Sequence, residues 1–228
     1  MITANPIGLW QWSWDYQGEF QPVLSPLNEL ISVMRVLDSR GLSRRSADAH
    51  LIALGRQVTL YDATIALDVD STIEDLKRIA AQVSAAAGEK KVLLVQIFVD
   101  CSPSAYFADR IEVLDGALRI GVIADVGDAP FMSVHLQTNT DVWMPYDLRG
   151  VAQQDTFQRN GPRLTAALDG IAEVLGVETE PDDPTLFAKP TISGLRNHLD
   201  ENGYPEDTGF YERTDIASES PSVRRSIE

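Results

Sequence analysis

Residues 64–100, with the sequence TIALDVDSTIEDLKRIAAQVSAAAGEKKVLLVQIFVD, decide the fold of this chain. The alternation over residues 64–69 predicts a strand, and apolar side chains at three- and four-residue steps over residues 73–87 predict an amphipathic helix. Ser71 and Glu74 have the spacing of a capping box at the start of this helix, and Gly88 is a typical helix end. Residues 92–99 are almost wholly apolar, which predicts a central strand covered on both faces. The connection is long enough for a crossover, so the stretch predicts a right-handed βαβ unit.

Further elements are predicted before this unit. Ser25 and Pro26 predict the start of a helix, with Ser25 as its N-cap, and Gly41 predicts its end. Residues 50–54 and 57–61 predict two short strands that are joined by a hairpin turn.

The elements predicted after the unit are a meander and two helices. Residues 110–137 predict three antiparallel strands, in which Asp115-Gly116 is the strongest hairpin signal of the chain. Asn160-Gly161-Pro162 predicts the start of a helix that ends at Gly176, and residues 191–202 predict a short helix. The chain is therefore predicted to be α+β, a single domain over residues 1–212. Its sheet is expected to be mixed and mostly antiparallel, with one βαβ unit and helices packed against it. Residues 213–228 are expected to form a polar, flexible tail.

Composition limits the class of protein. The chain has 228 residues, 44% of them hydrophobic, which suits one sizeable core. Cys101 is the only cysteine, so neither an intrachain disulfide nor a cysteine-based metal cluster can form. No apolar run approaches the roughly 18 residues of a membrane span, and no signal-peptide pattern is present. We therefore expect a cytoplasmic protein that does not enter a membrane.

The net charge of −15 determines which partners are expected. A field of that sign repels nucleic acid and anionic membranes and favours a basic protein partner, although it also serves solubility alone. The charge is uneven, since residues 176–228 hold 12 acidic and 5 basic side chains.

Asp68-Val69-Asp70-Ser71-Thr72-Ile73 follows an apolar strand and resembles the first motif of the haloacid-dehalogenase-type phosphatases. That resemblance implies that Asp68 is a nucleophile, that Asp70 is a general acid and that both help to hold Mg²⁺. The alternative interpretation is that Asp70 flanks the helix start, where acidic residues interact favourably with the helix dipole.

Trp10, Trp12 and Trp14 lie at a period of two, so on a strand the three rings share one face. They form either an aromatic platform for a ligand or part of the core. Rings of this size usually bury large areas, so the core is favoured.

Residues 139–147 combine aromatic rings with carboxylates in an irregular segment. Asp141, Trp143, Tyr146 and Asp147 are the candidate partner-binding residues, because rings in a rigid loop anchor interfaces and carboxylates suit a basic partner. In the alternative interpretation, Trp143 and Tyr146 pin the loop to its own core.

No coherent catalytic or cofactor motif is present. His50, His135 and His198 lack ligand neighbours at metal-binding spacing, and the chain has no Gly-x-Ser-x-Gly or Walker sequence. We therefore expect no cofactor. The preferred hypothesis is a non-catalytic, acidic binding protein, in its concrete form an immunity-type inhibitor of a basic toxin domain. The alternatives are a Mg²⁺-dependent phosphohydrolase that uses Asp68 and Asp70, and a small-molecule-binding or regulatory domain with an aromatic pocket.

Overall fold

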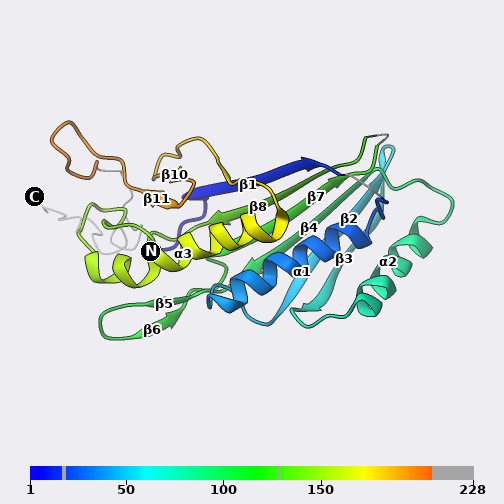
Figure 1. Cartoon of the computed structure of the whole chain (residues 1–228), viewed down its shortest axis with the longest axis horizontal. Coiled ribbons are helices and arrows are strands. Elements are labelled where there is room, and N and C mark those ends of the chain that lie inside the picture. Colours follow the sequence, from blue (N-terminus) through cyan, green and yellow to red (C-terminus); the bar gives the residue numbers. More distant parts are fainter. Residues whose placement is uncertain (17–18, 128, 207–228) are drawn as a thin grey trace, which may run out of the picture.

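The computed structural model describes residues 1–16, 19–127 and 129–206, and these form one α+β fold (Figure 1). Its main element is a seven-stranded sheet in the order β3-β2-β4-β7-β8-β1-β9. The strands are β1 (Gly8–Asp15), β2 (Ser46–Gly55), β3 (Val58–Asp68), β4 (Leu94–Cys101), β7 (Leu118–Asp125), β8 (Phe131–Thr138) and β9 (Glu180–Pro181). Two separate hairpins pair β5 (Ser104–Tyr106) with β6 (Ile111–Val113), and β10 (Lys189–Thr191) with β11 (Gly194–Arg196).

Three helices cover one face of the sheet. They are α1 (Leu24–Ser39), α2 (Ile73–Ala87) and α3 (Gln154–Leu175). Figure 1 shows α1 and α3 side by side across the strands, with α2 next to β3. The α+β class and the predicted helices packed against the sheet are therefore confirmed.

The predicted βαβ unit is present in a split form. β3 and β4 both run antiparallel to β2, so they are parallel to each other, with β2 between them. All neighbouring strands of the seven-stranded sheet are antiparallel. β4 was expected to be covered on both faces, and this is wrong. Val95, Ile97, Val99 and Cys101 are buried under the helices, whereas the alternate residues on the other face are only partly buried or exposed.

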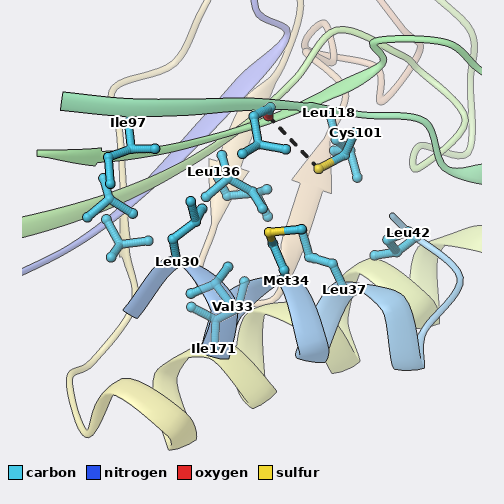
Figure 2. Packing of buried hydrophobic residues seen from close by; sticks show 14 of the residues in the cluster. Leu30, Val33, Met34, Leu37, Leu42, Ile97, Cys101, Leu118, Leu136 and Ile171 are labelled. Atoms are coloured by element: carbon cyan, nitrogen blue, oxygen red, sulfur yellow. Dashed lines mark hydrogen bonds between the residues drawn. The ribbon is translucent and has the colours of Figure 1, made fainter. Parts of the chain in front are cut away.

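The core lies between this sheet and the helices (Figure 2). Leu30 and Met34 of α1 point toward Leu118 and Leu136 of the sheet, and Val33 packs toward Ile171 of α3. All of these side chains are at most 1% exposed, and burial of each such side chain contributes about 1.5–3 kcal/mol. The apolar stripe predicted over residues 73–87 is confirmed for Leu76, Val83 and Ala87, which are buried, whereas Ile73 at its start is 47% exposed.

Both predicted N-caps are wrong, each by one or two residues. The N-cap of α2 is Thr72, whose hydroxyl accepts a hydrogen bond from the Asp75 N–H at 3.3 Å, while the Asp75 carboxylate accepts from the Thr72 N–H at 3.0 Å. The Ser71 hydroxyl accepts instead from the Asp68 N–H. In α1, Ser25 already lies inside the helix, and its hydroxyl accepts from the Gln21 N–H.

The predicted ends of these helices are confirmed. Gly41 has φ +64° and follows α1, where the Leu42 N–H donates to the Leu37 carbonyl at 2.8 Å in a Schellman motif. Gly88 has φ +59° and ends α2.

The hairpin predicted at Asp115-Gly116 is absent from the described residues. β6 pairs with β5 instead of β7, because the Leu114 N–H donates to the Pro103 carbonyl at 2.9 Å and folds this segment back on itself. Gly116 has positive φ and the Ala117 N–H donates to the Leu114 carbonyl, so a turn does form there, but Asp115 lacks the positive φ that a type I′ hairpin turn also requires. The other predicted hairpins, β2–β3 and β7–β8, are confirmed.

Two predictions in the C-terminal third are also wrong. α3 starts at Gln154, so Asn160-Gly161-Pro162 lies inside it. Pro162 removes one helical N–H, whose acceptor would be the carbonyl of the exposed residue Gln158. Residues 191–202 contain the turn and second strand of the β10–β11 hairpin, where a short helix was predicted.

No helix among the described residues is long and apolar enough to cross a membrane. The predicted domain boundary at residue 212 and the predicted tail over residues 213–228 lie outside the described residues.

Candidate functional site

The tryptophan strand belongs to the core. Trp10 and Trp12 of β1 are fully buried, and Trp14 is partly buried. The Trp10 indole N–H donates to the Thr191 carbonyl at 2.8 Å, and that of Trp12 to the Thr179 hydroxyl at 3.1 Å. These hydrogen bonds connect the segments after α3 to the sheet. Because Trp10 and Trp12 are fully buried, they offer no surface to a ligand.

Asp68 and Asp70 do not meet the geometric needs of the phosphatase motif. Asp68 ends β3 and lies opposite Ser46 in an antiparallel pair, away from both cavities described below. Hydrogen bonds from Ser46 and from the Asp70 N–H hold the pKa of the Asp68 carboxyl below its usual value, and the Asp70 carboxylate pairs with Arg45. Among the described residues, no group of three or more His, Cys, Asp or Glu side chains is arranged to hold a metal ion.

Three of the four candidate partner-binding residues are buried and hold their own loop together. The carboxylate of Asp141 is 2.5 Å from the Met1 amino group and accepts the Leu148 N–H at 3.1 Å. Trp143 is 1% exposed and donates to the Thr138 hydroxyl at 2.8 Å. Asp147 accepts from the Val151 N–H and pairs with Arg149. Neither carboxylate therefore faces a partner, and only Tyr146 retains part of its surface.

Tyr146 lines a large groove, a cavity of about 830 Å³ at one end of the molecule. One wall is the outer side of α3, and the other is the β10–β11 hairpin with the residues that follow it. The loop of Trp143 and Tyr146 closes one end. Most of the lining is apolar, including Phe157, Leu195 and Leu199, while Asp169 and Arg196 are the charged residues in it. We call this cavity the α3–β11 groove.

Three contacts fix the walls of the α3–β11 groove. The Asn197 amide pairs with both backbone groups of Tyr146, at 3.2 Å to the N–H and 2.9 Å to the carbonyl. The Thr165 hydroxyl donates to the Ser193 carbonyl at 2.5 Å, which joins α3 to the hairpin turn. A Cβ on Gly8 would lie 2.5 Å from Leu195 Cδ2, so β11 rests directly on the start of β1. These contacts hold the two walls and the loop at the end of the groove in place.

Exposed carboxylates are concentrated in the stretch of chain that also supplies β11 and Leu199 to the groove. Residues 173–206, which we call the acidic segment, contain eight acidic and two basic side chains, all of them exposed. The acidic ones are Glu173, Glu178, Glu180, Asp182, Asp183, Asp200, Glu201 and Glu206. None of the eight forms an ion pair with another described residue, whereas carboxylates elsewhere, such as Asp70, Asp75 and Asp100, pair with arginines. Their charge is therefore not compensated within the described chain.

The acidic segment also exposes large apolar side chains. Leu186, Ile192 and Tyr204 are 73%, 67% and 68% exposed, and Leu199 of the groove is 47% exposed. Hydrogen bonds from the backbone N–H groups of Tyr204 and Asn202 hold the pKa of Asp200 below its usual value. Apolar side chains beside unpaired charges are typical of an interaction surface rather than of a purely solvating face.

A smaller cavity of about 280 Å³ lies on the sheet face that the helices leave open. It is lined by Asp48, His50, Thr64, Phe98, Asp100 and Arg119. Arg119 donates to both oxygens of Asp100 at 2.6 and 3.0 Å, and His50 pairs with Asp62 at 2.6 Å. Because most of these charges already satisfy one another, the cavity is a weaker candidate than the α3–β11 groove.

Comparison with known proteins gives no functional information, since no family model, curated protein or solved structure matches this chain. The site rests on geometry alone. Of its residues, the sequence indicated only Trp143 and Tyr146. Phe157, Asp169 and Leu199 were missed because the true start of α3 and the β10–β11 hairpin were not predicted. A usable signal was present at Leu186, an apolar residue in an acidic stretch outside every predicted element, whereas Ile192 and Leu199 fall within the short helix predicted over residues 191–202.

Proposed function

We propose that this protein is a non-catalytic binding protein whose partner is a basic protein. The observation that supports the proposal most strongly is the pairing of an apolar groove with eight exposed carboxylates that have no ion-pair partner in the described chain. The earlier choice of Asp141 and Asp147 as the acidic contacts is replaced by this set, while Tyr146 is retained as a contact.

The two features act at different stages of binding. The uncompensated negative charge, within a net charge of −15, attracts a cationic partner over a distance of about a Debye length and raises the association rate. The groove then receives an apolar or aromatic anchor of the partner, and burial of that anchor slows dissociation. Exposed carboxylates of the acidic segment favour basic partners and disfavour acidic ones.

The concrete form of the proposal is an immunity-type inhibitor that works in the cytoplasm. A toxin domain that cleaves nucleic acid must present a positively charged cleft to its substrate. An acidic protein that fills this cleft blocks the substrate without any chemistry of its own. This form is consistent with the net charge of −15.

The test is binding to a panel of purified basic nuclease toxin domains, with acidic domains of similar size as controls. Affinity is measured at about 0.05 M and about 0.5 M salt, over which range exposed charges become strongly screened. The proposal predicts at least one complex that weakens with salt and that inhibits cleavage of nucleic acid. It is contradicted if no basic domain binds, or if the acidic domains bind equally well.

A second candidate function is the binding of an apolar small molecule. A cavity of about 830 Å³ lies within the roughly 300–1,000 Å³ that is usual for small-molecule sites. The aromatic pocket of this alternative would be formed by Trp143, Tyr146 and Phe157, since Trp10 and Trp12 are in the core. An uncharged dye such as Nile red provides the test. Dye binding that Tyr146→Ala abolishes, in a protein that binds no basic domain, would favour this candidate.

A further inference from the structure

One wall of the α3–β11 groove is an unpaired strand edge. β11 pairs only with β10 among the described residues. Thr191 and Gly194 flank the two-residue turn and face each other, so they form the hydrogen-bonded pair next to it. Pro190 and Leu195 are then the non-hydrogen-bonded pair, which suits a proline without an N–H. The backbone N–H and C=O of Leu195 therefore point away from β10.

These two groups have no hydrogen-bond partner in the part of the chain that the structure describes. β10 lies on the β1 side of the hairpin, where Thr191 accepts the indole N–H of Trp10, and α3 contacts β11. The free edge of β11 therefore faces α3 across the groove. A strand edge of this kind is a template for pairing with another chain.

The opposite wall leaves room for a backbone. At the centre of α3 the groove is lined by Gly161, Thr165 and Ala166, which have small side chains. Gly161 itself is covered, because a Cβ there would lie 2.7 Å from the ring of Phe157. Thr165 touches the hairpin turn, so the room for an added segment is the part of the groove beside Ala166, within its volume of about 830 Å³.

We propose that the α3–β11 groove binds an extended segment of the basic partner, which adds to the edge of β11 as a further strand. Strand addition specifies how the basic partner would bind, so this proposal rests on the proposed function. The segment would exchange backbone hydrogen bonds with Leu195, and its side chains would alternate between two environments. One set would be apolar and enter the cavity beside Tyr146 and Phe157. The other set would be lysine or arginine placed beside Asp169, which no described cation pairs with, and away from Arg196, the one basic residue of the lining.

The negative net charge of the chain favours a basic segment, and not a second copy of the chain, as the occupant of the α3–β11 groove. A second copy of the chain would bring its own net charge of −15 and eight further unpaired carboxylates to the same place. A basic segment instead neutralises Asp169 and its neighbour Glu173, one helical turn further along α3.

The probe is a synthetic peptide of about ten residues, the length of a long strand, in which lysine alternates with leucine around a central phenylalanine. Two matched probes accompany it, one N-methylated at the central residues and one with glutamate in place of lysine. The full-length chain is titrated with each while amide exchange and ¹⁵N shifts are followed by NMR. We expect the Leu195 N–H to gain protection with the parent probe. N-methylation should weaken binding by about 2- to 10-fold, the worth of one lost hydrogen bond.

Variants of the protein locate the site. Ala166→Phe should fill the groove and weaken the parent probe at least about 10-fold, because about 1.4 kcal/mol of steric or lost-contact free energy has that effect. Ala86→Phe, on the exposed side of α2, is the matched control and should leave binding unchanged. Asp169→Asn should weaken binding by about 1.5- to 5-fold, the range for an exposed ion pair, while Asp48→Asn on the open sheet face should not.

The possible results separate the two proposals. If basic domains bind with salt dependence but the N-methylated probe binds as tightly as its parent and Leu195 stays unprotected, strand addition is wrong and the proposed function survives. If neither the basic domains nor the parent probe binds, both fail. Strand addition by a partner is also overturned if the free protein is a dimer that Ala166→Phe converts to a monomer. Strand addition by a partner is likewise overturned if a spin label attached at Ser222→Cys broadens the NMR signal of the Leu195 amide before any peptide is added. The groove would then be occupied by a segment of the same chain.

Discussion

The side-chain amide of Asn160 pairs with both backbone groups of Tyr106, accepting its N–H at 3.0 Å and donating to its carbonyl at 2.9 Å. Asn160 is fully buried in α3, and Tyr106 ends β5, so one side chain joins the β5–β6 hairpin to the helix. The neighbouring Arg163 donates to the carbonyls of Arg40, Gly41 and Ser104, which joins α3 to the end of α1 as well. The helix that forms one wall of the groove is thus fixed by polar contacts on its inner side.

Replacing Asn160 should therefore be costly. Asn160→Ala leaves two backbone groups of Tyr106 without their partner and should lower the free energy of unfolding by about 2–4 kcal/mol. Asn28→Ala, at an exposed position of α1, is the control and should change it by less than about 0.5 kcal/mol. Urea unfolding measures both. An equal loss in the free energy of unfolding for the two variants would show that the hydrogen bonds between Asn160 and Tyr106 contribute nothing to stability.

Asp141 should be a stability residue and not a contact for the partner. Asp141→Asn removes the charge that faces the Met1 amino group inside the protein, where loss of one member of an ion pair costs about 3 kcal/mol. Asp109→Asn, exposed on the β5–β6 loop, should cost less than about 1 kcal/mol. Unfolding by urea and peptide binding are measured on the same samples. The assignment fails if Asp141→Asn is as stable as the parent protein but has lost binding.

His135 should make the protein sensitive to mild acid. Burial of its ring on β8 lowers its pKa below the usual value, while the charge of Asp182 opposes this in part. The unfolded chain takes up the proton near the usual pKa and the folded chain only at lower pH, so acidification through this window favours unfolding. The free energy of unfolding should therefore fall from pH 7.5 to pH 5.5 by less in His135→Gln than in the parent protein. A variant with the parent's pH dependence would exclude His135 as the cause.

Cys101 should react only in the unfolded state. Burial raises the pKa of its thiol to about 11, and Figure 2 shows the sulfur enclosed among core side chains, pointing toward the Val99 carbonyl. At pH 8 both the thiolate fraction and access to the sulfur are therefore small. Labelling by a thiol reagent should be slow in buffer and should rise with urea in parallel with unfolding. Rapid labelling of the folded protein would contradict this burial.

Sequence patterns predicted the parts of this fold that depend on local periodicity. The stripes of α1 and α2, the ends at Gly41 and Gly88 and the split β3-α2-β4 unit follow from spacing alone. The pairing of β6 with β5 does not, because Asp115-Gly116 carries the same turn signal whichever strand is adjacent. The start of α3 was missed because tertiary contacts of Asn160 keep Pro162 inside a helix. The groove depends on the start of α3 and on the β10–β11 hairpin, whose positions are set by tertiary contacts, so the sequence indicated some of its residues but not the groove itself.

The most direct test of the central claim is the affinity of the lysine–leucine peptide for a charge-neutralised variant. Glu173, Glu201 and Glu206 are exposed and form no ion pair with a described residue, so Glu173→Gln, Glu201→Gln and Glu206→Gln can be combined without loss of a known contact. The account predicts at least about 10-fold weaker binding at low salt and a flatter salt dependence, at unchanged stability. An affinity and salt dependence equal to those of the parent protein would contradict it.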